Sequence, residues 1–167
     1  MRLLLLPVLL LVPAFGCSDA PAPPDSEKGA SPTLPESFWA TETAEGALDV
    51  LALREEDLAG RTVTVRGTVK DFVEGLSAFV LVEDSFLSCD ERPGDTCKTP
   101  WDYCCTDPEE LARGTTFVEF REGDEPGAWA VEGFHGIERL SEVFVSGTLA
   151  IDDADNLRLV ATSIGLQ

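Results

Sequence analysis

The sequence predicts a mainly β domain in which five short strands close a small barrel, with a helix before the first strand and a cysteine-rich insertion between the second and third. Three observations support this prediction. Five apolar runs are short and alternate with polar residues or end at turn residues. A segment with helical character precedes the fourth run. Gly67 and Gly147 lie at strand centres, where glycine lets a strongly curved strand turn a barrel corner. A β-sandwich is the alternative that this pattern leaves open.

Residues 1–16 are predicted to be a signal peptide. The apolar run Leu3–Phe15 follows the positive charge of Arg2 and is too short to span a bilayer. It also contains two prolines, which would break a spanning helix. Its length is that of the hydrophobic region of a secretory signal.

The run ends in Ala14-Phe15-Gly16-Cys17, which resembles the lipobox of bacterial lipoproteins, with Ala14 in place of the usual leucine. The resemblance implies cleavage before Cys17, lipid modification of that cysteine, and attachment to a membrane through its acyl chains. Ser18 does not resemble an inner-membrane retention signal, which implies the outer membrane of the cell envelope, facing the periplasm or the exterior. Plain secretion and an uncleaved anchor are the alternatives.

Residues 17–37 are predicted to be the lipidated cysteine and a proline-rich linker. Five prolines and few large apolar side chains follow Cys17, so burial cannot offset the entropy cost of ordering this stretch. We expect an extended, solvated tether that lifts a domain of residues 38–167 off the bilayer. A proline-rich recognition segment is the alternative.

Helical spacing predicts a helix within residues 44–58, with Gly60 as its stop. Strict alternation over residues 61–70 then predicts a half-buried strand, in which Gly67 marks a bend or a bulge. Further strands are predicted over residues 78–82, 115–121, 142–151 and 157–164, with a turn at 152–156 and a short helix within 133–140.

Residues 60–69, GRTVTVRGTV, followed by the apolar second strand, resemble the opening of OB-fold domains of the bacterial anticodon-binding-like and periplasmic types. Residues 143–149 and 157–162 resemble the closing hairpin of those domains. The resemblance implies a five-stranded OB-like barrel. The long segment 83–114 departs from a minimal OB barrel, because it inserts a cysteine-rich loop between the second and third strands.

Four of the five cysteines of the chain lie in this insertion: Cys89, Cys97, Cys104 and Cys105. An even number of cysteines in an oxidising compartment favours two disulfides, which would fix a loop that is too acidic to order itself by burial. A bond between adjacent cysteines would strain the ring that it closes. We therefore expect Cys104 and Cys105 to reach separately to Cys89 and Cys97, in either pairing.

Metal binding is the alternative for the same cysteines. Four thiolates suit a zinc or copper ion, and His135 could add a ligand after a chain reversal. The segment lacks the CxxC pair that forms a ready chelating turn. Thiol–disulfide exchange at Cys104 and Cys105 is a third, weaker alternative.

The net charge of −19 argues against nucleic acid as a partner, because an acidic chain repels phosphate backbones. Arg61, Arg66 and Lys70 form an isolated basic line on the first strand. The acidic residues of 83–110 and 152–156 are interpreted as solvated surface, with calcium binding as the alternative.

The sequence contains few of the residues and motifs on which a catalytic mechanism could depend. His135 is the single histidine, and there is no nucleophile elbow or phosphate-binding glycine loop. We therefore expect a non-enzymatic, lipid-anchored binding or structural domain of the cell envelope without a cofactor. Its partner would be a small solute, a cation or an envelope protein. A thiol-based zinc or copper protein is the alternative function.

Overall fold

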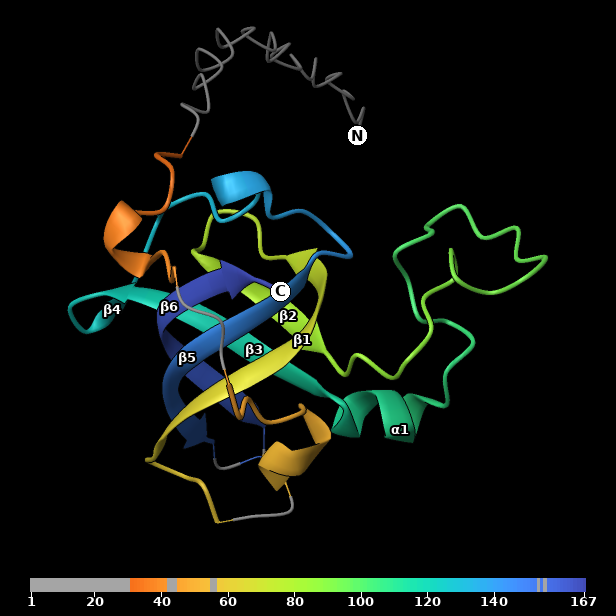
Figure 1. Ribbon diagram of the computed structural model, residues 1–167, viewed down its shortest axis with the longest axis horizontal. Coiled ribbons are helices and arrows are strands. Elements are labelled where there is room, and N and C mark those ends of the chain that lie inside the picture. The colour runs from red at the N-terminus through yellow and green to blue at the C-terminus, as the bar shows by residue number, and fades with distance from the viewer. Residues whose placement is uncertain (1–30, 42–44, 55–56, 153, 155) are drawn as a thin grey trace, which may run out of the picture.

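The computed structural model describes residues 31–41, 45–54, 57–152, 154 and 156–167, and its centre is a closed β-barrel (Figure 1). Five strands form the barrel: β1 (Thr62–Phe72), β2 (Ala78–Val82), β3 (Thr115–Glu122), β5 (Glu142–Ile151) and β6 (Leu157–Leu166). The short strand β4 (Glu125–Pro126) pairs with the end of β3 and lies outside the barrel. All five predicted strands are therefore present, within a few residues of the expected bounds.

The strand order closes the sheet on itself. β1 is antiparallel to both β2 and β5, β2 is antiparallel to β3, and β5 is antiparallel to β6. The ring is completed by β3 and β6, which run parallel. Five strands in this order make an OB-like barrel, which confirms the predicted fold class and excludes the β-sandwich.

Gly67 and Gly147 do lie at the centres of β1 and β5, at points where strands come very close. A Cβ atom on Gly67 would lie 2.6 Å from the carbonyl oxygen of Val82, and one on Gly147 would meet the backbone of Val160. Of the bend or bulge expected at Gly67, the bulge is elsewhere, because the register of β1 against β2 shifts between Val69 and Asp71. Gly67 is thus required for close strand approach and not for a bulge.

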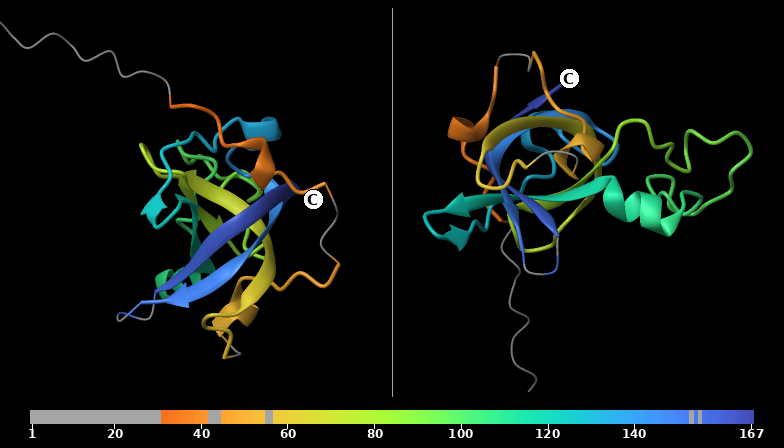
Figure 2. Two further views of the ribbon diagram at one scale, coloured as in Figure 1. Left: turned by 90° about the vertical axis from the view of Figure 1, so that its left-hand side faces the viewer. Right: turned by 90° about the horizontal axis from the view of Figure 1, so that it is seen from below.

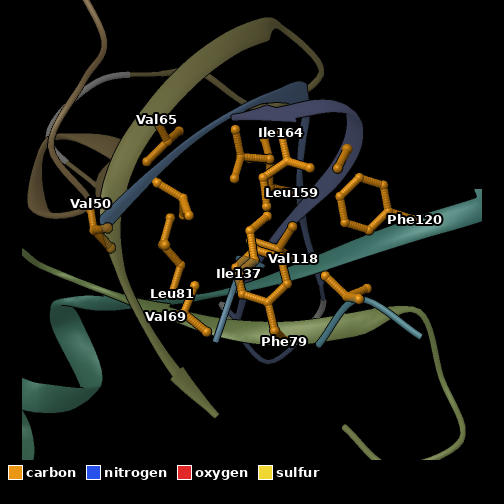
Figure 3. Packing of buried hydrophobic residues seen from close by; sticks show 14 of the residues in the cluster. Val50, Val65, Val69, Phe79, Leu81, Val118, Phe120, Ile137, Leu159 and Ile164 are labelled. Atoms are coloured by element: carbon orange, nitrogen blue, oxygen red, sulfur yellow. The ribbon is translucent and has the colours of Figure 1, made fainter. Parts of the chain in front are cut away.

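The interior of the barrel is a single apolar cluster to which every barrel strand contributes (Figure 3). The fully buried members labelled there include Val65, Val69, Phe79, Leu81, Val118, Phe120, Ile137, Leu159 and Ile164. Alternation places these side chains inward and their polar neighbours outward.

Residues 31–41, which we call the N-terminal strap, run along one end of the barrel. Leu34 is buried, its N–H donates to the carbonyl of Ala130 at 3.0 Å, and the N–H of Ala40 donates to Ile164 at 2.9 Å. Packing therefore begins before Phe38, inside the stretch that composition assigns to the linker. The strap contains the 3-10 helix η1 (Glu36–Phe38).

The helix expected within residues 44–58 is found only as the 3-10 helix η2 (Leu51–Arg54) in the described part of that range. Leu48 instead pairs with β1, because its N–H donates to Thr64 and its carbonyl accepts from Arg66, both at 2.9 Å. Tertiary pairing with an exposed strand edge outweighs the helical spacing of the sequence.

Two further helices complete the fold. The α-helix α1 (Pro108–Arg113) leads into β3 and was not predicted, although Asp107 caps it and Pro108 occupies its first turn. The 3-10 helix η3 (Phe134–Gly136) lies inside the segment where a short helix was expected. In the described residues, no helix has the length and apolar character needed to cross a bilayer.

Candidate metal centre

The insertion between β2 and β3 projects from one side of the barrel, as Figure 1 and the right-hand view of Figure 2 both show. It leaves β2 at Val82 and returns to β3 through α1. We call residues 83–107 the cysteine loop. It contains all four cysteines of the described residues.

Carboxylates fold this loop by accepting hydrogen bonds from its own backbone. Glu91 Oε2 accepts from both the N–H and the hydroxyl of Ser88, each at 2.8 Å. Asp95 Oδ1 accepts from the N–H of Cys97 at 2.6 Å, and Asp102 Oδ1 accepts from the N–H next to it at 2.8 Å. Much of the acidic character of the loop is therefore structural.

The loop is attached to the barrel through an aromatic pair. Tyr103 is buried, with 1% of its surface exposed, and burial raises the pKa of its hydroxyl. Trp101 lies against the guanidinium of Arg139, 5.1 Å from ring centre to Cζ. Lys70 at the end of β1 approaches Asp102 at 3.6 Å. These contacts hold the segment just before Cys104 in a fixed position.

Three cysteines converge at the base of the loop. The Sγ of Cys104 lies 3.3 Å from that of Cys89 and 3.7 Å from that of Cys97. All three Sγ atoms lie within 4.8 Å of one another. Cys89 is buried, Cys97 is half-buried and Cys104 is exposed, so the group opens to solvent on one side. We call these three residues the cysteine triad.

The protonation of the triad is uneven. Hydrogen bonds from Thr99 lower the pKa of Cys97, whereas burial raises the pKa of Cys89. The pKa of Cys104 is raised because its thiol hydrogen-bonds to the neighbouring sulfurs of Cys89, Cys97 and Cys105. The pKa values of the three thiols are therefore shifted in different directions: that of Cys97 is lowered, and those of Cys89 and Cys104 are raised.

Cys105 lies beside the triad but outside it. Its Sγ is 3.9 Å from Cys104 Sγ and 3.8 Å from Asp95 Oδ2. All four residues are thiols in the structure, so the two disulfides remain a prediction. The contacts bring Cys104 beside both Cys89 and Cys97, but they do not bring Cys105 beside either.

The sulfur spacing suits a bound ion. A metal–sulfur bond of about 2.3 Å in a tetrahedral site separates neighbouring sulfurs by about 3.8 Å. The observed separations of 3.3 and 3.7 Å differ from this value by about half an ångström or less. The triad could therefore close on an ion after a small movement of Cys89, without refolding the loop.

His135 does not join this group. Its ring stacks on Trp39 with centroids 4.0 Å apart, and its Nε2 lies 2.8 Å from Glu36 Oε2. The backbone of His135 has a φ of 47°, a left-handed conformation that departs from helical geometry within η3. The structure thus uses the single histidine to fasten the N-terminal strap, and the chain reversal that would bring it to the cysteines does not occur.

The remaining candidate residues have structural partners or lie outside the described part of the chain. Asp152 accepts hydrogen bonds from the side-chain amide of Asn156 and from the backbone N–H groups of Asn156 and Ala154, all at 2.9 Å, and these bonds lower its pKa. In the basic line of β1, Arg66 pairs with Asp49, and Lys70 pairs with the cysteine loop as described above. The predicted lipidation site, Cys17, lies among the residues that the structure does not describe.

Two supporting residues of the site were not anticipated. Asp95 fixes the backbone at Cys97, and the hydroxyl of Thr99 lies 3.7 Å from Cys97 Sγ. Their short separation from Cys97 along the chain is the signal that could have identified them, since Asp and Thr side chains bond readily to nearby backbone and side-chain groups.

Comparisons with known proteins do not identify a family for this chain. No protein-family model matches the chain, and no curated protein matches it. Among solved structures it is similar to a protein assigned as an aspartyl-tRNA synthetase from Leishmania major Friedlin, with 14% identity and a TM-score of 0.43 over 82% of this chain and 23% of the other. It is similar to the aspartyl-tRNA synthetase of Entamoeba histolytica, with 12% identity and a TM-score of 0.45 over 87% of this chain and 28% of that one. An OBody bound to hen egg-white lysozyme has 15% identity and a TM-score of 0.37, over 66% of this chain and 81% of its own.

The chain therefore spans less than a third of either synthetase. The assignment of an OB-like barrel rests on its own strand order.

Proposed function

We propose that this chain is a non-enzymatic, lipid-anchored protein of the cell envelope that presents a thiolate site for a soft metal ion on an OB-like barrel. The observation that carries the proposal is the convergence of Cys89, Cys97 and Cys104, whose sulfurs lie within 4.8 Å of one another. Soft thiolate donors select copper, zinc or iron–sulfur centres over hard cations. The barrel supplies a rigid support for the site, and the anchor supplies its location.

The envelope location is supported by the first seventeen residues. A positive charge, a short apolar run and the lipobox-like Ala14–Cys17 occur in the order that a lipoprotein signal requires. Cys17 is also distant in sequence from the other four cysteines, so its lipid modification would use none of the sulfurs of the triad.

A non-enzymatic role is supported by the engagement of His135 with Glu36 and Trp39. A thiol nucleophile would need a general base within hydrogen-bond reach. The sulfurs of the triad contact other thiols and the hydroxyl of Thr99, whereas the carboxylate of Asp95 lies 3.8 Å from the sulfur of Cys105, outside the triad. Such a group is better suited to binding than to proton transfer.

Two structural disulfides are the second candidate, favoured by the 3.3 Å approach of Cys89 and Cys104. Oxidation would remove the sulfurs from metal binding, so the two candidates exclude each other at this pair. In that case the loop would be a covalently fixed surface for another partner.

Intact mass spectrometry of the full chain distinguishes the candidates. We expect the protein, purified from membranes in mild detergent, to retain one metal ion and to be alkylated at the exposed Cys105, while Cys89, Cys97 and Cys104 resist alkylation until a chelator is added. A chain that lacks metal, resists alkylation until reductant is added and still binds no ion after reduction would contradict metal binding.

Matched variants assign the thiols. Cys89→Ser is expected to abolish metal retention, because it removes the buried sulfur of the triad. Cys105→Ser is the control, since it removes an exposed sulfur outside the triad and should leave metal content unchanged. Equal loss in both variants would contradict the assigned triad.

The anchor is tested by Cys17→Ser. We expect this variant to move from the membrane to the soluble fraction, because it has no site for the acyl chains. Ser18→Ala is the control and should remain with the membrane. Continued membrane association of Cys17→Ser would contradict the lipid anchor.

A further inference from the structure

We infer that the ion held by the cysteine triad is monovalent copper, bound by three sulfurs alone; this inference rests on the proposed metal-binding function. It follows from the number of donors that the loop can offer, from the way its oxygen donors are used, and from the exposure of one side of the site.

The donor set is three sulfurs. Among the described residues, the group of metal-binding side chains with mutually close ligand atoms consists of Cys89, Cys97 and Cys104. Zinc in structural sites takes four protein ligands in a tetrahedron. With three protein ligands, zinc keeps a water in the fourth position. Monovalent copper is softer and carries a lower charge, so three thiolates can complete its coordination without a fourth ligand.

The nearby oxygens are committed elsewhere. Asp95 Oδ1 binds the N–H of Cys97, Glu91 Oε2 binds Ser88, and Asp102 Oδ1 accepts from the adjacent backbone N–H. No carboxylate of the described residues belongs to the group of mutually close ligand atoms, so a hard or borderline ion that needs one would require a carboxylate to turn toward the sulfurs and away from the hydrogen bonds that shape the loop. A sulfur-bound ion leaves them intact.

Cys105 is the sulfur that could provide a fourth ligand, and its position argues against that role. It follows Cys104 directly, and its Sγ contacts Asp95 Oδ2 at 3.8 Å. For two consecutive cysteines to bind one ion, the backbone between them must turn sharply. The tight placement of Tyr103, which is 1% exposed, limits this movement.

The exposure of the triad gives the ion a route in and out. Cys89 is at the buried end and Cys104 at the exposed end. An incoming thiolate or other soft donor could add to copper on the exposed side while Cys89 and Cys97 still hold it. The site is therefore suited to receiving and passing on the ion by ligand exchange.

The test is a pair of anaerobic titrations on the reduced, chelator-treated full chain. One uses monovalent copper in competition with a coloured copper chelator, and the other uses zinc in competition with a zinc indicator. We expect one copper ion per chain, sulfur-to-copper absorption in the ultraviolet, and copper affinity at least about 1,000-fold above that for zinc. X-ray absorption should report three sulfur neighbours.

Variants complete the test. Cys97→Ser is expected to lower copper affinity by about 100-fold or more, and Cys105→Ser should match the parent. Tighter zinc binding, a four-sulfur shell, or an equal loss in Cys105→Ser would overturn the assignment of copper while leaving metal binding in place. Failure to bind either ion would remove the proposed function itself.

Discussion

At Gly67 the backbone of β1 passes so close to β2 that no side chain fits between them. A Cβ atom there would lie 2.6 Å from the carbonyl oxygen of Val82 and 2.8 Å from Cγ of Leu81. The first of these is backbone and cannot rotate away, so the strands would have to separate. The single hydrogen on this residue thus sets how tightly the barrel closes.

We expect Gly67→Ala to lower the free energy of unfolding by about 1–3 kcal/mol, because an added methyl group overpacks the contact. Chemical denaturation followed by circular dichroism measures this change. Arg61→Ala, just before β1, is the control and should alter stability by less than about 0.5 kcal/mol. Equal stability of the two variants would show that the strands can separate at little cost.

At Trp101 one aromatic ring connects the cysteine loop to the barrel. We expect Trp101→Ala to leave the melting temperature of the barrel nearly unchanged, because the contact with Arg139 is worth only about 0.5–1 kcal/mol. Amide exchange in residues 89–105 should nevertheless become faster, and metal affinity should fall by about 10-fold. Trp101→Phe retains a ring and should have a smaller effect; identical behaviour of both would argue against the stacking.

Among the elements, the barrel strands and the short helix within 133–140 were predicted from the sequence, whereas α1 was not. Alternation alone located β1, because its side chains face the core and solvent in turn. The expected helix within 44–58 failed because Leu48 finds backbone partners on β1, and pairing with a distant strand leaves no signal in local spacing. In α1, by contrast, the capping Asp107 and Pro108 were visible in the sequence.

The arrangement of the cysteine loop could not be predicted from local sequence spacing either. The sequence grouped four cysteines, but the three that converge depend on turns fixed by Asp95 and Asp102 and on the burial of Tyr103. These are contacts within the folded loop and with the barrel. Spacing along the chain could therefore identify the sulfur chemistry, but not its arrangement.

The β5–β6 hairpin depends on one carboxylate. The pKa of Asp152 is lowered by its hydrogen bonds to Asn156 and Ala154. A lowered pKa in the folded state stabilises the fold at pH values above the unfolded value of about 3.9, and this contribution is lost as the pH falls through the folded pKa.

We therefore expect Asp152→Ala to be less stable than the parent at pH 7, and the difference to shrink as the pH falls below about 4. Thermal melts over this pH range provide the measurement. Asp124→Ala, at an exposed turn, is the control and should show no such pH dependence. A stability gap that stays constant with pH would mean that the carboxylate charge is not involved.

At the scale of the whole molecule, the N-terminal strap extends the packed domain to residues before Phe38. Leu34 is 2% exposed and Phe38 packs edge-on against Phe120, with ring centroids 5.1 Å apart. The strap thus covers one end of the barrel, where it contacts the short helix η3 through Trp39 and His135. Residues that composition assigns to a linker contribute to the core.

We expect Leu34→Ala to destabilise the domain by about 2–4 kcal/mol, because it leaves a cavity under the strap. Ser37→Ala, also in the strap, is the control and should change stability by less than about 0.5 kcal/mol. Differential scanning calorimetry measures both. A Leu34→Ala variant that melts like the parent would show that the strap packs on the barrel without supporting it.

The strap has a mechanical consequence. Any pull transmitted from the N-terminal side of the domain reaches the backbone hydrogen bonds of Leu34 and Ala40 before it reaches a barrel strand. Each of these hydrogen bonds belongs to a parallel bridge between the strap and another segment. Tension along the strap therefore acts on the bonds in shear and loads them together. Under sufficient force the strap would separate from the barrel first and expose its apolar side chains, while the strands stay paired and the projecting loop remains undisturbed.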